Sequence, residues 1–136
     1  MSQKNKDVVI WFINEILNPN RPELAEEVFH VDATSTGTTS GLFGENKLKD
    51  LRTFSGLYHN SFSDFHVEIK EIFSERDKVF LAIEISGTHD GEDFLGIRAR
   101  GKKISWTSFN IYYLKKHKIW KHWGISNLDT RLDLLR

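Results

Sequence analysis

The feature that most constrains this chain is an aromatic-rich stretch near its C-terminal end, Ile104 to Ile125, with the sequence ISWTSFNIYYLKKHKIWKHWGI. It has the pattern of two long strands joined by a short Lys/His turn, and apolar residues occur at both odd and even positions. A hairpin with one solvated face alternates apolar and polar residues. This pattern therefore predicts a hairpin that is covered on both faces.

The first half of the chain supplies helices that can cover one of those faces. Apolar residues recur at helical spacing over residues 4–17, and Pro19 ends this helix because the residue before a proline avoids the helical region. A proline is well placed at the start of the short second helix, residues 22–29, and a third helix is expected over about 45–61. The Thr/Ser/Gly-rich residues 30–44 between them are expected to form a loop, with a short strand within it as the alternative.

From Phe65 onward the apolar period changes from that of a helix to the alternation of a strand. About four long antiparallel strands follow, and Leu128, Leu132 and Leu135 predict a short C-terminal helix that docks on the sheet. Helices first and strands afterwards predict an α+β domain. We expect one domain over residues 1–136, a cone-shaped curved antiparallel sheet with the N-terminal helices on its concave face and a ligand site at the open mouth.

Composition excludes several classes of function. Nineteen Lys and Arg balance nineteen Asp and Glu, so the chain lacks the basic footprint of a nucleic-acid-binding protein. It has no cysteine, which removes disulfides and thiolate chemistry. The polar start MSQKNKD is unlike a secretory signal, and no apolar run approaches the roughly 20 residues that span a bilayer. We expect a cytoplasmic protein that binds neither nucleic acid nor membrane.

The even positions of the hairpin form the candidate site. They hold Trp106, Asn110, Tyr112, Trp120 and His122. If the turn comprises the three residues 115–117, Asn110 lies opposite His122 and Tyr112 lies opposite Trp120, with about 5 Å between opposed Cβ atoms. A two-residue turn would change this pairing. Aromatic walls with a few polar groups are typical of a small-molecule pocket.

Asn110 and His122 have two interpretations. His122 is suited to proton transfer near neutrality, and Asn110 can stabilise an oxyanion. Alternatively, the two side chains only satisfy each other's hydrogen bonds inside a core. No carboxylate partner is evident, and no HxH, HxxxH or HExxH spacing supports a metal site, so we expect neither a metal nor a cofactor.

The odd positions of the hairpin indicate a protein contact. They include Phe109, Ile111, Tyr113 and Trp123, which a solvated sheet would not expose together. A second copy of the chain packed sheet to sheet is the simplest cover, so we expect a homodimer through this face.

Four motifs occur together in the second half of the chain: GTHDGED at 87–93, LGI at 95–97, GKKI at 101–104 and IWKHWGI at 119–125. With these motifs the chain resembles, nearly end to end, the SnoaL-like polyketide cyclases, often called ester cyclases, of the nuclear-transport-factor-two-like superfamily. The resemblance implies a homodimer with a hydrophobic cone in each subunit. It also implies cofactor-free aldol chemistry on a polyketide-like carbonyl compound.

The resemblance further implies an acid–base Asp on the last strand, at or just beyond the His-Trp pair. In this chain the corresponding positions hold Gly124 and Asn127, and the nearest acid, Asp129, is out of register. His122 matches the family's histidine, and Asn110 occupies a position that is often polar in the family. The resemblance thus supports the fold and the pocket more strongly than the reaction.

Three functional hypotheses follow. The first is a cofactor-free cyclase or isomerase that acts on a small apolar or polyketide-like molecule, with His122 as acid or base and Asn110 polarising a carbonyl. Its pocket walls would be Trp11, Phe12, Trp106, Tyr112 and Trp120. The second is a ligand-binding module without catalysis, and the third is a structural dimerisation domain with a filled core.

Overall fold

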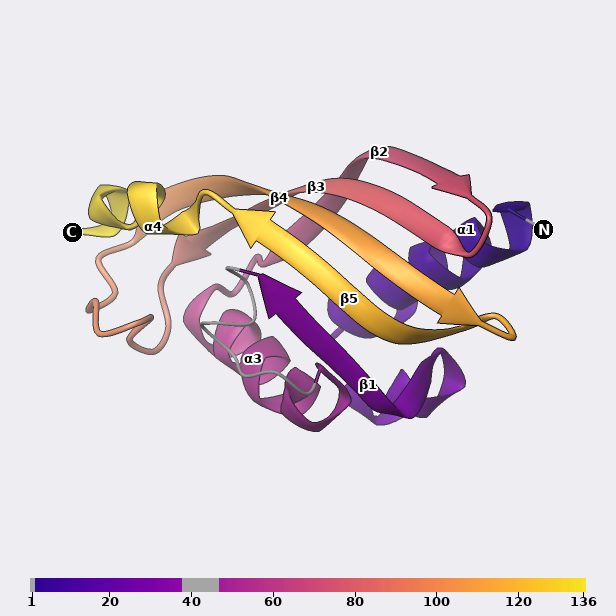
Figure 1. The fold of residues 1–136 in the computed structure, drawn as a ribbon. Coiled ribbons are helices and arrows are strands. Elements are labelled where there is room, and N and C mark those ends of the chain that lie inside the picture. The colour runs from indigo at the N-terminus through magenta and orange to yellow at the C-terminus, as the bar shows by residue number, and fades with distance from the viewer. Residues whose placement is uncertain (1, 38–46) are drawn as a thin grey trace.

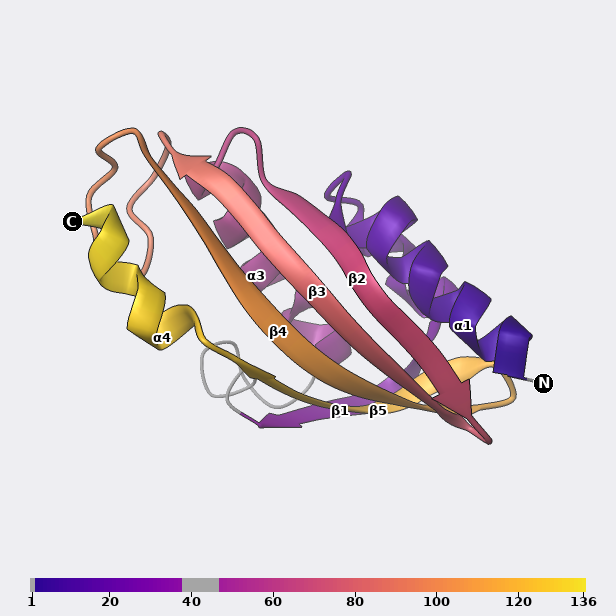
Figure 2. The same ribbon diagram turned by 90° about the horizontal axis from the view of Figure 1, so that it is seen from above.

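A curved sheet with helices on its concave side forms the fold of the computed structural model, which describes residues 2–37 and 47–136. The strands are β1 (Phe29–Gly37), β2 (His66–Glu75), β3 (Lys78–His89), β4 (Lys102–Lys115) and β5 (Lys118–Ser126). Their spatial order in the five-stranded sheet is β1-β5-β4-β3-β2. Figure 1 shows the helices α1 (Ser2–Trp11) and α3 (Lys47–Ser61) on one side of the sheet, and Figure 2 views the same layers from the strand side. The predicted cone-shaped α+β fold is confirmed.

The first helix ends where the sequence predicts. α1 continues into a wider π-helical turn, Phe12–Leu17, and the chain leaves the helix at Asn18, before Pro19. The Asn18 side chain then contacts the edge strand β2: its Nδ2 donates to the Val67 carbonyl at 3.0 Å, and its Oδ1 accepts from the Val67 N–H at 2.7 Å. The amide thus occupies both outward backbone groups of one residue of that edge strand.

The first part of the segment 30–44 forms a strand, which was the alternative to the expected loop. After a short 3-10 helix, Pro22–Glu27, the chain enters β1, which pairs with β5 in parallel. β1 has the polar sequence FHVDATSTG, yet Phe29, Ala33 and Ser35 are buried while their neighbours are largely exposed. Residues 38–44 of the predicted loop, and the predicted helix start at 45–46, lie outside the described residues.

The four predicted antiparallel strands are confirmed, but the tip of their last hairpin differs from the prediction. Lys115 pairs with Lys118, so the turn consists of Lys116 and His117 alone. Both turn residues have positive φ, 50° and 63°. Two left-handed residues in succession are what a type I′ turn requires, and this turn matches the right-handed twist of the strands. The expected three-residue turn is therefore wrong.

A bulge follows the turn and displaces Trp120. Leu114 pairs with Ile119, whereas Tyr113 pairs with Lys121, so Trp120 is the extra residue on β5. Its ring lies 6.2 Å from the Tyr113 ring, and the Lys115 ammonium lies 4.1 Å from its centre. Trp120 therefore belongs to the outer face of the sheet, not to the concave face where we expected it.

Beyond the bulge the register differs by two residues from the expected one. Asn110 is paired with Gly124 and Tyr112 with His122. Because the turn and the bulge each shift the pairing by one residue, the two shifts together preserve the face of every later side chain. Asn110 and His122 are diagonal neighbours on the concave face rather than opposed ones.

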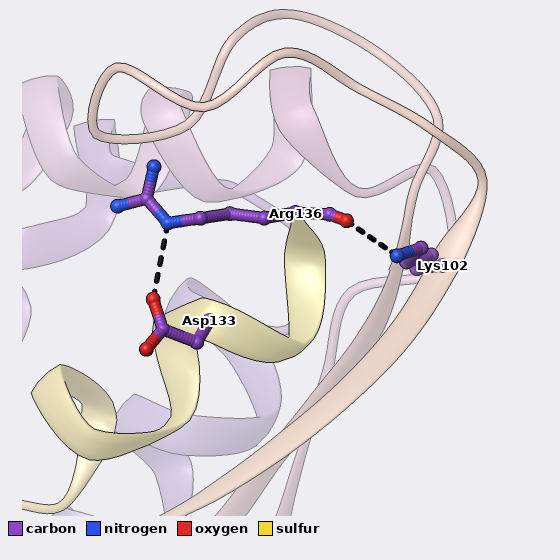
Figure 3. Close-up of polar contacts among 3 residues, drawn as sticks. All are labelled: Lys102, Asp133 and Arg136. Atoms are coloured by element: carbon purple, nitrogen blue, oxygen red, sulfur yellow. Dashed lines mark hydrogen bonds and ion pairs between the residues drawn. The ribbon is translucent and has the colours of Figure 1, made fainter.

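The C-terminal segment docks on the sheet, as predicted. It consists of α4 (Leu128–Arg131) and a 3-10 turn, Leu132–Leu135, with Leu128 and Leu135 buried in the core. Figure 3 shows two of its polar contacts: Lys102 of β4 donates to the Arg136 carbonyl, and Arg136 Nε donates to Asp133 Oδ1 at 3.1 Å. The tail thereby covers one end of the sheet beside the start of β4.

No helix among the described residues is long and apolar enough to cross a membrane.

Candidate functional site

A small cavity lies between the helices and the concave face of the sheet. Its helical wall includes Phe12, Leu17, Phe54 and Tyr58, and its sheet wall includes Trp106, Ser108, Asn110 and Tyr112. The cavity volume is about 50 Å³. A dry cavity of about 150 Å³ admits benzene, and ligand pockets usually measure about 300–1,000 Å³. The cone is therefore largely filled by its own side chains.

Behind this wall, His122 is held by two neutral side chains. The ring is buried, with 1% of its surface exposed. Its Nε2 lies 2.7 Å from Asn110 Oδ1, and its Nδ1 lies 2.7 Å from Ser35 Oγ. β1, β4 and β5 thus each contribute one member of this group, which we call the Ser35–His122–Asn110 network.

The Asn110 amide fixes the direction of these hydrogen bonds. Its Nδ2 donates to the Leu81 carbonyl at 3.3 Å and to Ser108 Oγ at 3.0 Å. A carbonyl oxygen only accepts, so the amide nitrogen must face Leu81 and Oδ1 must face His122. Oδ1 also only accepts, so His122 Nε2 carries a proton. In the neutral ring Nδ1 is then an acceptor for the Ser35 hydroxyl.

The position that the family resemblance marks for the acid is closely packed. A Cβ on Gly124 would lie 2.6 Å from Asn110 Oδ1 and 2.9 Å from His122 Cε1. The contact between Asn110 and His122 thus occupies the space of a side chain at 124. Asn127, the other candidate position, is exposed, and its Oδ1 accepts from the Thr107 N–H at 2.8 Å. Neither position brings a carboxylate to the cavity.

Two tyrosines are the titratable residues among the described cavity walls. Burial raises the pKa of Tyr58 and the pKa of Tyr112 well above the ordinary value for tyrosine, because the phenolate would lose its hydration. Both therefore stay protonated at neutral pH. The described wall offers neutral hydrogen-bonding groups rather than a proton shuttle.

The predicted site residues divide into those at the cavity and those away from it. Phe12, Trp106, Asn110 and Tyr112 line it. His122 stands one hydrogen bond behind, at Asn110. Trp120 lies on the outer face, as described above.

Trp11 also differs from its predicted place. It is 36% exposed, whereas the next residue, Phe12, is buried and lines the cavity. The Trp11 side chain therefore points toward solvent, whereas that of Phe12 points into the interior. The prediction of both as walls is wrong for Trp11.

Sequence reasoning missed two serines of the site. Ser35 lies in the polar stretch that we expected to be a loop, so nothing in the sequence indicated that it would face His122. Ser108 could have been found, because it shares the even parity of Trp106 and Asn110 on the predicted strand. No group of His, Asp or Glu among the described residues is arranged to hold a metal ion.

The fold and the site define a class: an α+β cone with a small, aromatic-walled interior and neutral polar groups on its sheet side. The chain belongs to the SnoaL-like polyketide cyclase family, whose pattern matches residues 7–133. The expected resemblance is thereby confirmed. A comparison with curated proteins gives no match.

Solved structures share this fold over nearly the whole chain. IdmH from Streptomyces antibioticus superposes with a TM-score of 0.81 at 22% identity, covering 96% of this chain and 97% of its own. TsrD from Streptomyces laurentii superposes with a TM-score of 0.82 at 16% identity, covering 98% of this chain and 94% of its own. A SnoaL-like polyketide cyclase from Agrobacterium tumefaciens superposes with a TM-score of 0.73 at 13% identity, covering 95% of this chain and 94% of its own. At such identities the similarity establishes the nuclear-transport-factor-two-like fold alone.

Proposed function

We propose that this protein binds a small, largely apolar molecule in its cone, and that binding does not require a proton-transfer step. The observation that carries the proposal is the composition of the cavity wall: aromatic rings together with the neutral polar groups of Ser108, Asn110 and Tyr112. Such a wall suits a ligand with an apolar body and one polar end.

The size of the cavity limits how a ligand enters. At about 50 Å³ it is smaller than a benzene-sized site, so a ligand must displace side chains of the helical wall. Leu17 is a suitable candidate, because it lines the cavity at the end of the first helix and keeps 7% of its surface exposed. The proposal therefore predicts that affinity depends on the volume of this wall.

Three proteins test the proposal: the wild type, Leu17→Ala, which enlarges the cavity, and Val67→Phe, which fills it. The probe is α-methylstyrene, followed by ligand-observed NMR. We expect weak binding by the wild type, at least fivefold tighter binding by Leu17→Ala, and none by Val67→Phe. Equal binding by all three folded proteins would place the probe outside the cone and overturn the proposal.

A second candidate is a cofactor-free cyclase or isomerase that acts on a carbon acid. Family membership supports it, as does the position of His122 one hydrogen bond behind the cavity wall. Enolisation of acetophenone is a suitable assay, because base removal of a methyl proton exchanges it for deuterium in D₂O. This candidate predicts protein-catalysed exchange that His122→Gln abolishes while ketone binding persists. If exchange is no faster with the protein than in buffer, the catalytic candidate is refuted and only the binding function remains.

We also propose that a second copy of the chain covers the outer face of the sheet. Large apolar side chains on this face remain exposed, among them Phe109 at 45% and Trp123 at 37%. A patch of this kind commonly marks a protein contact. Because the net charge of the chain is zero, two copies do not repel each other through their overall charge. In sedimentation velocity we expect a dimer for the wild type and for the exposed tail variant Leu134→Lys, and a monomer for Trp123→Glu. A monomeric wild type at all concentrations would overturn this proposal.

A further inference from the structure

We infer that the hydroxyl of Ser108, not the amide of Asn110, donates the hydrogen bond that orients the ligand, and that the ligand presents a carbonyl oxygen at this point. The inference rests on the proposed binding function and adds a contact and a chemical class to it. Its support is the fixed direction of the hydrogen bonds behind the cavity wall.

The first step is that Asn110 has no proton left for a ligand. Its amide nitrogen has two protons, and they are directed at the Leu81 carbonyl and at Ser108 Oγ. Its carbonyl oxygen accepts from His122. Recruiting Asn110 as an oxyanion donor would break one of these buried bonds, which costs about 1–3 kcal/mol for each group left unpaired.

The second step is that Ser108 does have a proton to give. Ser108 is buried, lines the cavity, and uses its oxygen to accept from Asn110 Nδ2. A hydroxyl that accepts one bond still has its own proton to donate. No described residue accepts that proton. The cavity is the space that Ser108 faces, so a ligand oxygen in the cavity would complete its bonding.

The third step is that the network behind Ser108 strengthens this donor. In the neutral state the protons run in one direction: Ser35 Oγ to His122 Nδ1, His122 Nε2 to Asn110 Oδ1, and Asn110 Nδ2 to Ser108 Oγ. Hydrogen bonds aligned in series polarise one another, by perhaps ~10–30% for each bond. A hydroxyl at the end of such a chain is a better donor than an isolated serine. His122 thus acts as a positioning residue for Ser108.

The chemistry of the remaining wall selects the ligand class. The donor is neutral, the lining is mainly aromatic and aliphatic, and the two buried tyrosines stay protonated. A ligand ammonium would face no anion among the described wall residues, and a carboxylate would lose its hydration without a cation. A neutral carbonyl oxygen needs only one donor and leaves its apolar body to the rings. An aryl or alkyl ketone fits these requirements.

The test compares two compounds of nearly the same shape, acetophenone and α-methylstyrene, in which a C=CH₂ group replaces C=O. The proteins are the wild type, Ser108→Ala, and the control Ser61→Ala, which removes a fully buried hydroxyl that bonds to the Asp93 carbonyl. Dissociation constants come from ligand-observed NMR. If the wild type binds too weakly, the same substitutions are made in the Leu17→Ala background. The infrared C=O stretch of bound acetophenone gives a second readout.

We expect Ser108→Ala to raise the dissociation constant of acetophenone about fivefold, which corresponds to one neutral hydrogen bond. The dissociation constant of α-methylstyrene should change by less than about twofold. The bound C=O stretch should lie at lower frequency in the wild type and in Ser61→Ala than in Ser108→Ala. Equal losses for both compounds, or no loss for the ketone, would overturn the role of Ser108 while the binding function stands. Failure of both compounds to bind the wild type and Leu17→Ala would remove the proposed function, and this inference with it.

Discussion

Two histidines of this protein are equally buried, at 1% exposure each, but they are bonded very differently. His122 has a neutral side chain at each ring nitrogen, Ser35 on one side and Asn110 on the other. His89, at the end of β3, donates from Nε2 to the Glu92 carbonyl at 2.8 Å, and its Nδ1 has no partner among the described residues. Burial alone therefore does not indicate which histidine is structurally essential.

The surroundings of the two rings differ as well. The two hydrogen bonds described above join the His122 ring to uncharged side chains. Beside His89 two carboxylates hold the chain: Asp64 accepts from the Thr88 N–H at 2.6 Å, and Asp90 accepts from the Ser63 N–H at 3.0 Å. We therefore expect the two neutral hydrogen bonds of His122 and the carboxylates near His89 to contribute differently to stability. Four substitutions test this difference.

The largest effect is expected for His122→Leu. The change leaves the Ser35 hydroxyl and the Asn110 carbonyl buried without their partner, which should lower the free energy of unfolding by about 2–4 kcal/mol. Urea denaturation measures it. In a double-mutant cycle, Ser35→Ala should cost less in the His122→Leu background than in the wild type. Additive costs would show that the two side chains do not interact.

The next effect is expected for Gly124→Ala, which tests the packing of the same region. The new Cβ would lie 2.6 Å from Asn110 Oδ1, so the network must move. We expect a loss of about 1–3 kcal/mol, as for other overpacked cores. Gly56→Ala is the control, because no atom lies within 4 Å of its Cβ and alanine favours the helix by about 0.5–1 kcal/mol. A stable Gly124→Ala would mean that the network tolerates displacement.

A smaller effect is expected for His89→Leu. The change loses one hydrogen bond to a loop carbonyl, but it also removes the unpartnered Nδ1 from the core. These contributions oppose each other, so the free energy of unfolding should stay within about 1 kcal/mol of the wild type. The measurement is the same urea denaturation as for His122→Leu. A loss as large as that of His122→Leu would remove the contrast between the two rings.

The smallest effect is expected for Asp64→Asn, and it should depend on pH. The hydrogen bond from the Thr88 N–H lowers the pKa of Asp64. A lowered folded-state pKa stabilises the fold above the unfolded value of about 3.9, and this contribution disappears as the pH falls through the folded pKa. The wild type should therefore exceed Asp64→Asn in stability at pH 7, and the difference should shrink below about pH 4. Asp129→Asn, at another exposed carboxylate, is the control. A difference that does not vary between pH 7 and pH 3 would refute the assignment.

Apart from Trp120, the residues predicted on the concave face of the last hairpin lie there, although the predicted pairing of the two strands was wrong. The turn residues Lys116 and His117 both adopt positive φ without being Gly or Asn, so composition did not indicate a two-residue turn. The bulge at Trp120 then restored the faces, and Asn110 and His122 met as expected although the register was wrong. Alternation records which face a side chain occupies, but it does not record its partner across the ladder.

The two missed serines illustrate what pattern reasoning leaves out. Ser35 belongs to a strand whose inward residues are few and partly polar, and such a strand has the composition of a loop. Ser108 was in the right place, but a serine among aromatic residues carries no signal of function. The direction of the hydrogen bonds is what points to a role for Ser108. That direction depends on the backbone carbonyl of Leu81, and every residue has such a carbonyl, so the sequence gives no sign of it. Such information is available only from the three-dimensional structure.

The contact of Asn18 with Val67 also bears on how copies of this protein can associate. An unpaired sheet edge can form backbone hydrogen bonds with a strand of another chain, and such pairing is a common first step in aggregation. At Val67 the outward N–H and C=O of β2 are already engaged by a side-chain amide that imitates a neighbouring peptide group. An incoming strand would have to displace that amide before it could pair along the start of this edge. Growth through β2 is thereby discouraged, whereas association of two sheets face to face is left unimpeded.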